Sequence, residues 1–259
     1  MAPEPKPRNG IEGLLLDAGG VLYQSGTALP GAVEAVRRLR AGGMPFRLLT
    51  NTTRTTRGAL AKKLESLGFD VSEEEIVTPA GVARTVLERD GAKPHLLVHP
   101  DLLPDCPEET AAPNAVLIGD AGDSFTFERM NRAFRVLIEG GRLYALGRNR
   151  FFRGTDGFEL DAGPFVAALE YAAGVEAILI GKPARGFFTA AADTLGVAHE
   201  NIAMVGDDLE SDIEGAIAAG LHAVLVRTGK YREGDGLAAK KGSARVAASL
   251  AEFVETLKL

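Results

Sequence analysis

Short aliphatic runs alternate with segments of helical periodicity along the chain, and this alternation constrains the fold more than any other feature. Residues 14–16 and 46–49 are apolar runs of strand length, and the segment 30–42 between them repeats apolar residues at helical spacing. The pattern returns toward the C-terminus, where helical segments separate three further apolar runs, at 177–180, 202–205 and 223–226. Strands that alternate with helices predict an α/β fold with a parallel sheet covered on both faces.

The middle of the chain contains a second alternating unit. An amphipathic helix is expected at 127–139, and glycine and proline residues mark both ends of the region. We therefore predict an inserted α/β domain at 80–177, with 1–79 and 178–259 forming one Rossmann-like core domain. The strands expected in the insert are at 95–98, 115–118 and 143–146.

Composition narrows the class of protein. The net charge of −6 gives no basic surface for nucleic acid and no polybasic stretch for an anionic membrane. No apolar run approaches the roughly 20 residues that span a bilayer, and the first ten residues lack the apolar segment of a signal peptide. Cys106 is the only cysteine, so no internal disulfide can form. We expect a cytoplasmic protein that binds neither nucleic acid nor membrane.

Two of the expected strands end in residues that could bind a phosphate group. Asp17 follows the first strand and opens a glycine-rich turn, where it could serve as a nucleophile, a metal ligand or simply a turn residue. Thr50 and Asn51 follow the strand at 46–49. A hydroxyl group and turn amides suit a phosphate oxygen, and they equally suit the cap of the next helix.

Two further motifs follow strands near the C-terminus. Lys182 directly precedes a proline and would project a cation into the same crevice, although most lysines are solvated surface charges. The strand at 202–205 leads into Asp207, Asp208 and, four residues later, Asp212. Three crowded carboxylates favour a hard cation such as Mg²⁺, and helix capping is the alternative.

This order of Asp, Thr, Lys and paired acids at strand ends resembles the haloacid dehalogenase (HAD) superfamily of phosphotransferases, in the group with a large cap inserted between the Thr and Lys motifs. Within it the sequence is most similar to the phospholysine phosphohistidine inorganic pyrophosphate phosphatases and their sister group. The resemblance implies a HAD-fold core with an inserted α/β cap domain. Four segments outside the motifs share in it: DAGDSF at 120–125, MNRAF at 130–134, ALEYA at 168–172 and RTGKYR at 227–232.

The resemblance also implies a mechanism. Asp17 would attack phosphorus and form an aspartyl phosphate, and Lys182 would neutralise both the nucleophile and the transferring group. The substrate would be a small phosphorylated compound, or phospholysine or phosphohistidine. The residues expected to contact it are Asp17, Ala18, Gly19, Thr50, Asn51 and Lys182.

A Mg²⁺ site is implied by the same resemblance. The Asp17 carboxylate, the backbone carbonyl of Gly19 and the Asp207 carboxylate would hold the ion. Asp212 would anchor Lys182 or the waters of the metal, and Asp208 is the alternative for this task.

Gly19 departs from the pattern of most phosphatases in this superfamily, which carry a second aspartate there to protonate the leaving group and activate water. General acid–base assistance is typically worth about 10²- to 10⁴-fold. We therefore expect activity on substrates whose leaving group departs easily, such as P–N bonds, pyrophosphate and aryl phosphates. The alternative is a catalytically weak phosphate-binding or regulatory protein. A receiver-like phosphoacceptor is disfavoured by the large insert.

Three weaker features complete the sequence-based predictions. Tyr23 follows the nucleophile turn and could line the substrate entrance. The apolar face of 127–137 is expected to belong to the cap core, with a homodimer formed through the cap as the alternative. The loop 147–157 could meet an anionic or aromatic substrate or could be an exposed basic loop; its cations are Arg148, Arg150 and Arg153.

Overall fold

The computed structural model describes residues 10–154, 157–257 and 259. Its contacts divide the chain into two compact units. The terminal unit comprises Met1–Thr50, Leu60–Val77 and Lys182–Leu259, and the inserted unit comprises Asn51–Ala59 and Thr78–Gly181. The predicted division into an inserted domain at 80–177 and a core domain formed by 1–79 and 178–259 stays a prediction.

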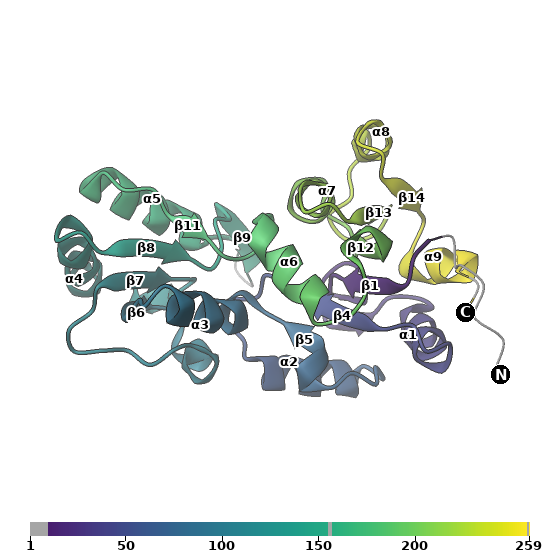
Figure 1. Cartoon of the computed structure of the whole chain (residues 1–259), viewed down its shortest axis with the longest axis horizontal. Helices are drawn as coiled ribbons and strands as arrows, with labels where there is room; N and C mark the ends of the chain where they lie inside the picture. The colour runs from purple at the N-terminus through teal and green to yellow at the C-terminus, as the bar shows by residue number, and fades with distance from the viewer. Residues whose placement is uncertain (1–9, 155–156, 258) are drawn as a thin grey trace. The chain divides into compact units, whose positions relative to one another are not determined.

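A six-stranded sheet forms the centre of the terminal unit (Figure 1). All of its strand pairs are parallel, and Leu15 of the central strand pairs with Met204 on one side and Arg47 on the other. The predicted parallel α/β architecture is confirmed. In spatial order the strands are β14 (Arg245–Ala247), β13 (His222–Val226), β12 (Ile202–Gly206), β1 (Gly13–Leu16), β4 (Phe46–Leu49) and β5 (Ile76–Val77).

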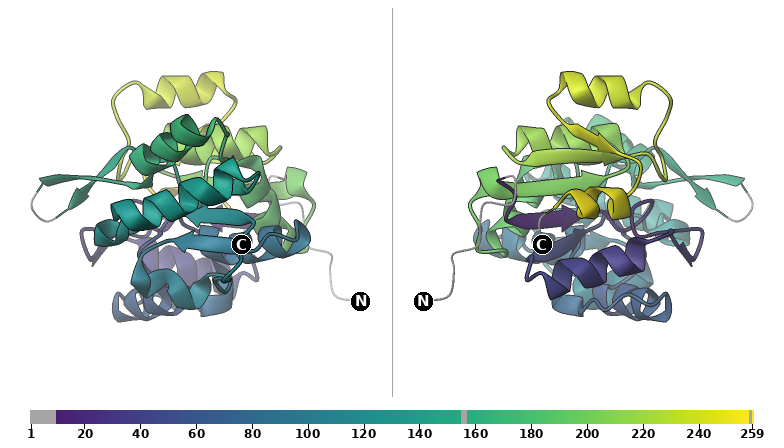
Figure 2. Two further views of the ribbon diagram at one scale, coloured as in Figure 1. Left: turned by 90° about the vertical axis from the view of Figure 1, so that its left-hand side faces the viewer. Right: turned by 90° about the vertical axis from the view of Figure 1, so that its right-hand side faces the viewer.

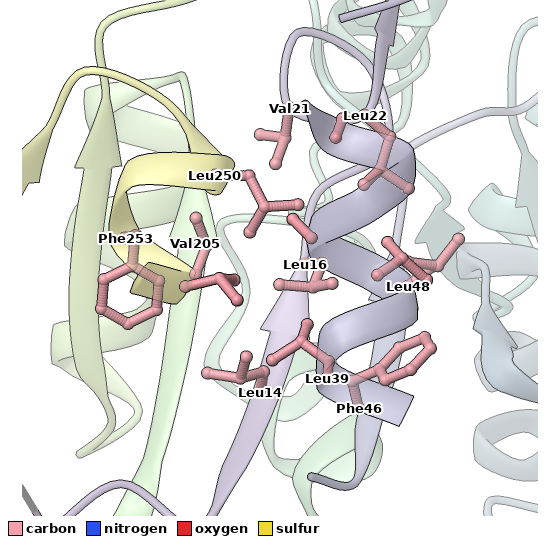
Figure 3. Close-up of a cluster of buried hydrophobic side chains, with 14 of the residues drawn as sticks. Leu14, Leu16, Val21, Leu22, Leu39, Phe46, Leu48, Val205, Leu250 and Phe253 are labelled. Atoms are coloured by element: carbon pink, nitrogen blue, oxygen red, sulfur yellow. The ribbon is translucent and has the colours of Figure 1, made fainter. Parts of the chain in front are cut away.

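Helices cover both faces of this sheet. Side chains of α1, α2 and α9 pack with alternate strand residues in one apolar cluster, whose members include Leu16, Leu39 and Phe253 (Figure 3). Figure 1 shows α6 and α7 on the opposite face. The helices of this unit are α1 (Ala32–Ala41), α2 (Arg57–Ser66), which starts in the segment assigned to the inserted unit, α6 (Arg185–Asp193), α7 (Gly215–Ala218), α8 (Asp235–Lys241) and α9 (Leu250–Thr256).

Short elements lie close to the strand ends of the terminal unit. A two-stranded hairpin follows the Asp17 turn, and a π-helical turn, η5, directly precedes α7. These elements are β2 (Tyr23–Gln24), β3 (Thr27–Ala28), η1 (Glu73–Glu75), η4 (His199–Asn201) and η5 (Leu209–Glu214).

The inserted unit has its own parallel sheet of four strands. The run at 177–180 was expected beside the core strands, but the structure pairs β11 with β8, so this strand closes the second sheet instead. Two strands form a separate hairpin (Figure 2). The sheet contains β11 (Ile178–Leu179), β8 (Arg142–Ala145), β7 (Ala115–Ile118) and β6 (Pro94–Leu97), and the hairpin contains β9 (Phe151–Gly154) and β10 (Gly157–Leu160).

Helices also cover both faces of the second sheet. On one face α3 (Pro79–Arg89) buries small and aliphatic residues, and on the other α4 (Phe127–Ile138) packs beside α5 (Ala162–Ala173). The central apolar residues of α4 are buried, which confirms that its apolar face belongs to the core, although Phe127 at its start is 85% exposed. The 3-10 turns are η2 (Pro100–Asp105) and η3 (Gly122–Ser124).

Candidate active site

The neighbouring strands β12, β1 and β4 end at the same edge of the terminal sheet, and this places Asp17 beside the acidic motif. The Asp17 backbone N–H donates to the Val205 carbonyl at 2.9 Å, which extends the strand pairing by one residue. Beyond it the chain turns sharply, with Gly20 in the left-handed region at a φ of 80°. The turn therefore presents Asp17 at the end of the strand.

Lys182 bridges two buried carboxylates. Its Nζ atom donates to Asp17 Oδ1 and to Asp212 Oδ1, each at 2.6 Å. All three residues are less than a tenth exposed. Loss of the Lys182 cation would leave two buried carboxylates without compensation, so its position between them is strongly favoured.

Asp207 adds a third carboxylate to this group. Oxygen atoms of Asp17, Asp207 and Asp212 lie within 4.8 Å of one another, and all three residues are buried. One lysine ammonium cannot balance three carboxylates, so the donor set suits a divalent cation with oxygen ligands. The bridge between Gly19 and Tyr23 uses neighbouring backbone groups and not the Gly19 carbonyl, and metal binding by that carbonyl stays a prediction.

The electrostatics of the group reflect this crowding. Burial raises the pKa of Asp17 to about 7, with Lys182 opposing the shift and the two other carboxylates adding to it. Burial likewise raises the pKa of Asp207 to about 6. For Lys182, burial would lower the pKa, but the adjacent Asp17 and Asp212 overcome this and hold its pKa above the usual value. A bound divalent cation reverses such shifts in carboxylates.

Thr50 and Asn51 occupy the end of β4 as expected. Thr50 is buried, and its backbone N–H donates to the Val77 carbonyl at 3.2 Å. Asn51 is assigned to the inserted unit. Phosphate binding by these two residues stays a prediction.

Asp208 is separated from the carboxylate group by its own partners. Its side chain accepts the Ser211 N–H at 3.0 Å as the cap of η5 and lies 3.0 Å from Lys230 Nζ. Of the two candidates for contacting Lys182, the structure places Asp212 there, and the second Asp212 oxygen accepts the Asp208 N–H at 3.2 Å.

The weaker candidates have less direct connections to the site. Tyr23 is half-buried, and burial together with the charge of Asp17 raises its pKa. Lys63 Nζ lies 4.3 Å from the centre of the Tyr23 ring. In the loop 147–157, Arg148 forms an ion pair with Glu170 at 2.5 Å, which gives it a structural partner. Arg150 is exposed, Arg153 lies on β9, and residues 155–156 lie outside the described residues.

Sequence reasoning missed the contribution of residues 228–230. The Lys230 backbone N–H donates to Asp207 Oδ2 at 2.6 Å, and the Thr228 hydroxyl donates to the Gly20 carbonyl. The segment RTGKYR was noted only for its resemblance. Gly229 after an apolar strand was the one available signal, because glycine at a strand end often marks a close backbone approach.

Comparisons with known proteins agree with this geometry. A family model described as haloacid dehalogenase-like hydrolase matches residues 14–107, and a HAD-hydrolase-like model matches residues 179–253. The phospholysine phosphohistidine inorganic pyrophosphate phosphatase of Xenopus laevis is 46% identical, over 88% of this chain and 87% of the relative. The chain belongs to the haloacid dehalogenase-like hydrolases.

Solved structures of phosphatases share the fold of this HAD-like hydrolase. A 4-nitrophenylphosphatase from Thermotoga maritima is 28% identical with a TM-score of 0.85, covering 95% of this chain and 97% of that one. A glycerol phosphate phosphatase from Mycobacterium tuberculosis, solved in complex with magnesium, is 25% identical with a TM-score of 0.84, covering 94% of this chain and 77% of that one. The two family-model segments contain Asp17, Asp207 and Asp212, the buried carboxylates that the structure brings together.

Proposed function

We propose that this HAD-like hydrolase is a Mg²⁺-dependent phosphohydrolase that works through an aspartyl phosphate. The observation that carries the proposal is the buried Asp17 carboxylate, whose Oδ1 atom lies 2.6 Å from Lys182 Nζ. Lys182 Nζ is in turn held by Asp212 Oδ1, also at 2.6 Å. A carboxylate fixed in this way is oriented for attack, and the adjacent ammonium stabilises the charge of a transferring phosphoryl group. The names of the relatives and neighbours support the same class of reaction.

Each step can be assigned to residues of the chain. In the first step an Asp17 oxygen attacks phosphorus, a bond from that oxygen to phosphorus forms, and the bond to the leaving group breaks. Lys182 compensates the charge of the phosphoryl oxygens, and the Thr50 hydroxyl is suited to bind one of them. In the second step water attacks phosphorus, the bond to Asp17 breaks, and inorganic phosphate leaves with the Asp17 carboxylate restored.

The metal that the family implies fits the residues present. Asp17, Asp207 and the Gly19 carbonyl would hold Mg²⁺, with Asp212 within reach of the same group. When bound, Mg²⁺ supplies positive charge that offsets the carboxylates and the phosphate oxygens. The magnesium complex of the structural neighbour from Mycobacterium tuberculosis supports this choice of ion.

Gly19 directs the proposal to substrates with good leaving groups. Without a carboxyl side chain at this position, a poor leaving group would receive no proton from it. A P–N bond can leave with its nitrogen already protonated, and pyrophosphate and aryl phosphates release stabilised anions. The relative from Xenopus laevis is named for phospholysine, phosphohistidine and inorganic pyrophosphate, which belong to this chemical class. We propose the same class for this chain.

Gly19 also supports one alternative, a protein that binds phosphate and turns over feebly. In this case Asp17 would still accept a phosphoryl group from a reactive donor, but the second step would stall because no side chain activates the water. A burst of product without continued turnover would identify this alternative.

The test measures release of phosphate from pyrophosphate and of p-nitrophenol from p-nitrophenyl phosphate, with Mg²⁺ and with a chelator. We expect Mg²⁺-dependent turnover by the wild-type chain and none by Asp17→Asn, a nearly isosteric change that removes the nucleophile. The thermal unfolding of both proteins serves as the control for folding. Retention of substantial activity by a folded Asp17→Asn variant would exclude the aspartyl-phosphate mechanism.

A further inference from the structure

The turn that follows β13 makes close contact with Asp207. The backbone N–H of Lys230 donates to Asp207 Oδ2 at 2.6 Å. Gly229 lies in the left-handed region at a φ of 59°, and a Cβ atom built on it would be 2.7 Å from Asp207 Cγ. Real Cβ atoms do not approach that closely, so only glycine allows this turn to lie against the carboxylate.

The same turn holds the loop that follows the proposed nucleophile. The Thr228 hydroxyl donates to the backbone carbonyl of Gly20. A Cβ atom built on Gly20 would be 2.6 Å from Asp207 Cγ and 3.0 Å from Gly229 Cα. Two glycines, one from each loop, therefore enclose the Asp207 carboxylate.

The turn is itself anchored at both ends. The Arg227 N–H donates to the Ala247 carbonyl at 3.0 Å, which ties the start of the turn to β14. The Tyr231 N–H closes the turn on the Thr228 carbonyl at 3.1 Å, and Lys230 Nζ lies 3.0 Å from Asp208 Oδ2. A segment with these attachments can fix the orientation of a neighbouring group.

We propose that residues 228–230, here called the clamp loop, are positioning residues for the metal-binding function of Asp207 and of the Asp17 turn. This inference rests on the proposed Mg²⁺-dependent function. The clamp loop supplies no ligand in the proposal. It restricts the rotation of the Asp207 carboxylate through the Lys230 N–H bond and the close approach of Gly229, and it fixes the Gly20 peptide through the Thr228 hydroxyl. Groups that orient a metal ligand typically change metal affinity by about 10- to 100-fold when they are removed.

The first test replaces the hydroxyl that holds the nucleophile turn. Thr228→Val keeps the shape of the side chain and removes its donor, and Thr228→Ser restores the donor. Mg²⁺ binding is measured by isothermal titration calorimetry in the absence of substrate. We expect Thr228→Val to bind Mg²⁺ about 10-fold more weakly and Thr228→Ser to recover most of the affinity.

Kinetics separate positioning from general damage to the fold. For Thr228→Val, we expect the Mg²⁺ concentration needed for half-maximal turnover to rise, while KM for p-nitrophenyl phosphate at saturating Mg²⁺ stays close to wild type. A structural role alone would lower stability without this selective change in the metal requirement.

The second test uses the glycine that lies against Asp207. Gly229→Ala introduces a Cβ that displaces the carboxylate, and we expect a loss of Mg²⁺ affinity of about 100-fold. Gly43→Ala is the matched control, because Gly43 has a similar φ of 63° and a Cβ there meets nothing within 4 Å. Both variants carry the same kind of backbone strain, so a difference in their Mg²⁺ affinities reports the contacts that a Cβ at position 229 makes with Asp207 and with Gly20 Cα.

The outcomes distinguish this proposal from the proposed function. If the wild-type chain neither binds Mg²⁺ nor requires it, the proposed function fails and the clamp loop loses its role with it. If wild type binds Mg²⁺ while Thr228→Val and Gly229→Ala bind it equally well, the clamp proposal alone is overturned. Should Gly229→Ala fail to fold, the comparison of Thr228→Val with Thr228→Ser decides the matter.

Discussion

Gly19 stands two residues after Asp17, where most phosphatases of the superfamily have an aspartate. The sequence left open whether the turn needs glycine here for a positive φ. In the structure the left-handed residue is Gly20, whereas the φ of Gly19 lies outside this region and a Cβ there meets nothing within 4 Å. The absence of a side chain at position 19 is therefore not imposed by the backbone, and the position can be tested chemically.

We predict that Gly19→Asp increases the hydrolysis of alkyl phosphates more than that of p-nitrophenyl phosphate. An alkoxide leaving group needs a proton, and acid–base assistance is worth up to about 10²- to 10⁴-fold. For the aryl substrate, any gain should come from the second step, so less phosphoenzyme should be trapped by acid quench. Gly19→Ala is the control for the backbone. An equal change for alkyl and aryl substrates would contradict this account of Gly19.

We predict that the three aspartates of the MVGDDLESD segment have different effects on the metal requirement. Asp207→Ala should raise the Mg²⁺ concentration for half-maximal activity most, because Asp207 lies in the carboxylate group and is proposed as a direct ligand. Asp208→Ala should have less effect, since Asp208 caps η5 and pairs with Lys230. Asp212→Ala should also lower kcat, because it removes a carboxylate that holds Lys182 in place. Titrations of activity with Mg²⁺ measure all three, and identical curves for Asp207→Ala and wild type would disprove the metal assignment.

The sequence could predict that Asp17, Lys182 and the acidic motif come together, because parallel strands end at one edge. It could not order Asp208 and Asp212, since their partners depend on the turn of η5, which has no periodic signal in six residues. The clamp loop escaped prediction for a different reason. Lys230 acts through its backbone N–H, which the sequence does not distinguish from that of any other residue. Gly229 acts through having no side chain, and a glycine shortly after an apolar run indicates a close approach without naming the group that it approaches.

For the helices and strands, the kind of element was easier to predict from the sequence than the sheet that a strand joins. The runs at 46–49 and 115–118 became β4 and β7 without change of bounds. The run at 177–180 became a two-residue strand in the other sheet, because an apolar run records its tendency to be buried and not which sheet it joins. The C-terminal elements α8, β14 and α9 were not predicted, since each spans seven residues or fewer.

We predict that the packing of α9 on the terminal sheet is a major source of stability. Phe253 is 3% exposed within the cluster of Figure 3, so Phe253→Ala should lower the free energy of unfolding by about 3–5 kcal/mol. Phe127→Ala removes the same side chain from a position that is 85% exposed and should change stability by less than about 0.5 kcal/mol. Urea denaturation followed by circular dichroism measures both. Equal losses for the two variants would rule out this role of α9.

At the scale of the whole molecule, the assignment of 51–59 to the inserted unit was not predicted. Two contacts explain it: Arg54 forms an ion pair with the buried Asp120, and the Arg57 N–H donates to Asp105 Oδ2 at 2.7 Å. These partners are distant in sequence, so composition gives no sign of them. Among the described residues, the helices are too short or too polar to cross a membrane. A homodimer formed through the inserted unit stays a prediction.

The pKa values of the site make the stability of the protein depend on pH and Mg²⁺ together. In the metal-free protein, burial raises the pKa of Asp17 to about 7 and that of Asp207 to about 6, well above the value of about 3.9 for an unfolded chain. At pH values between the unfolded and the folded pKa, these carboxylates bind more protons in the folded state than in the unfolded state. The contribution of both groups to stability therefore falls as pH rises from about 4 to 7.

We predict from this that Mg²⁺ raises the Tm more at pH 8 than at pH 5.5. Protons and Mg²⁺ compete for the same carboxylates, so at pH 5.5 the ion must displace protons, whereas at pH 8 it binds carboxylates that are ionised and repel one another. Tighter binding to the folded state gives a larger shift at a fixed Mg²⁺ concentration. Differential scanning fluorimetry at both pH values, with Mg²⁺ or a chelator, measures the difference. Asp207→Asn is the control, because it removes one of the competing carboxylates and should reduce the shift at pH 8 most. A shift as large at pH 5.5 as at pH 8 would show that Mg²⁺ does not bind at these carboxylates.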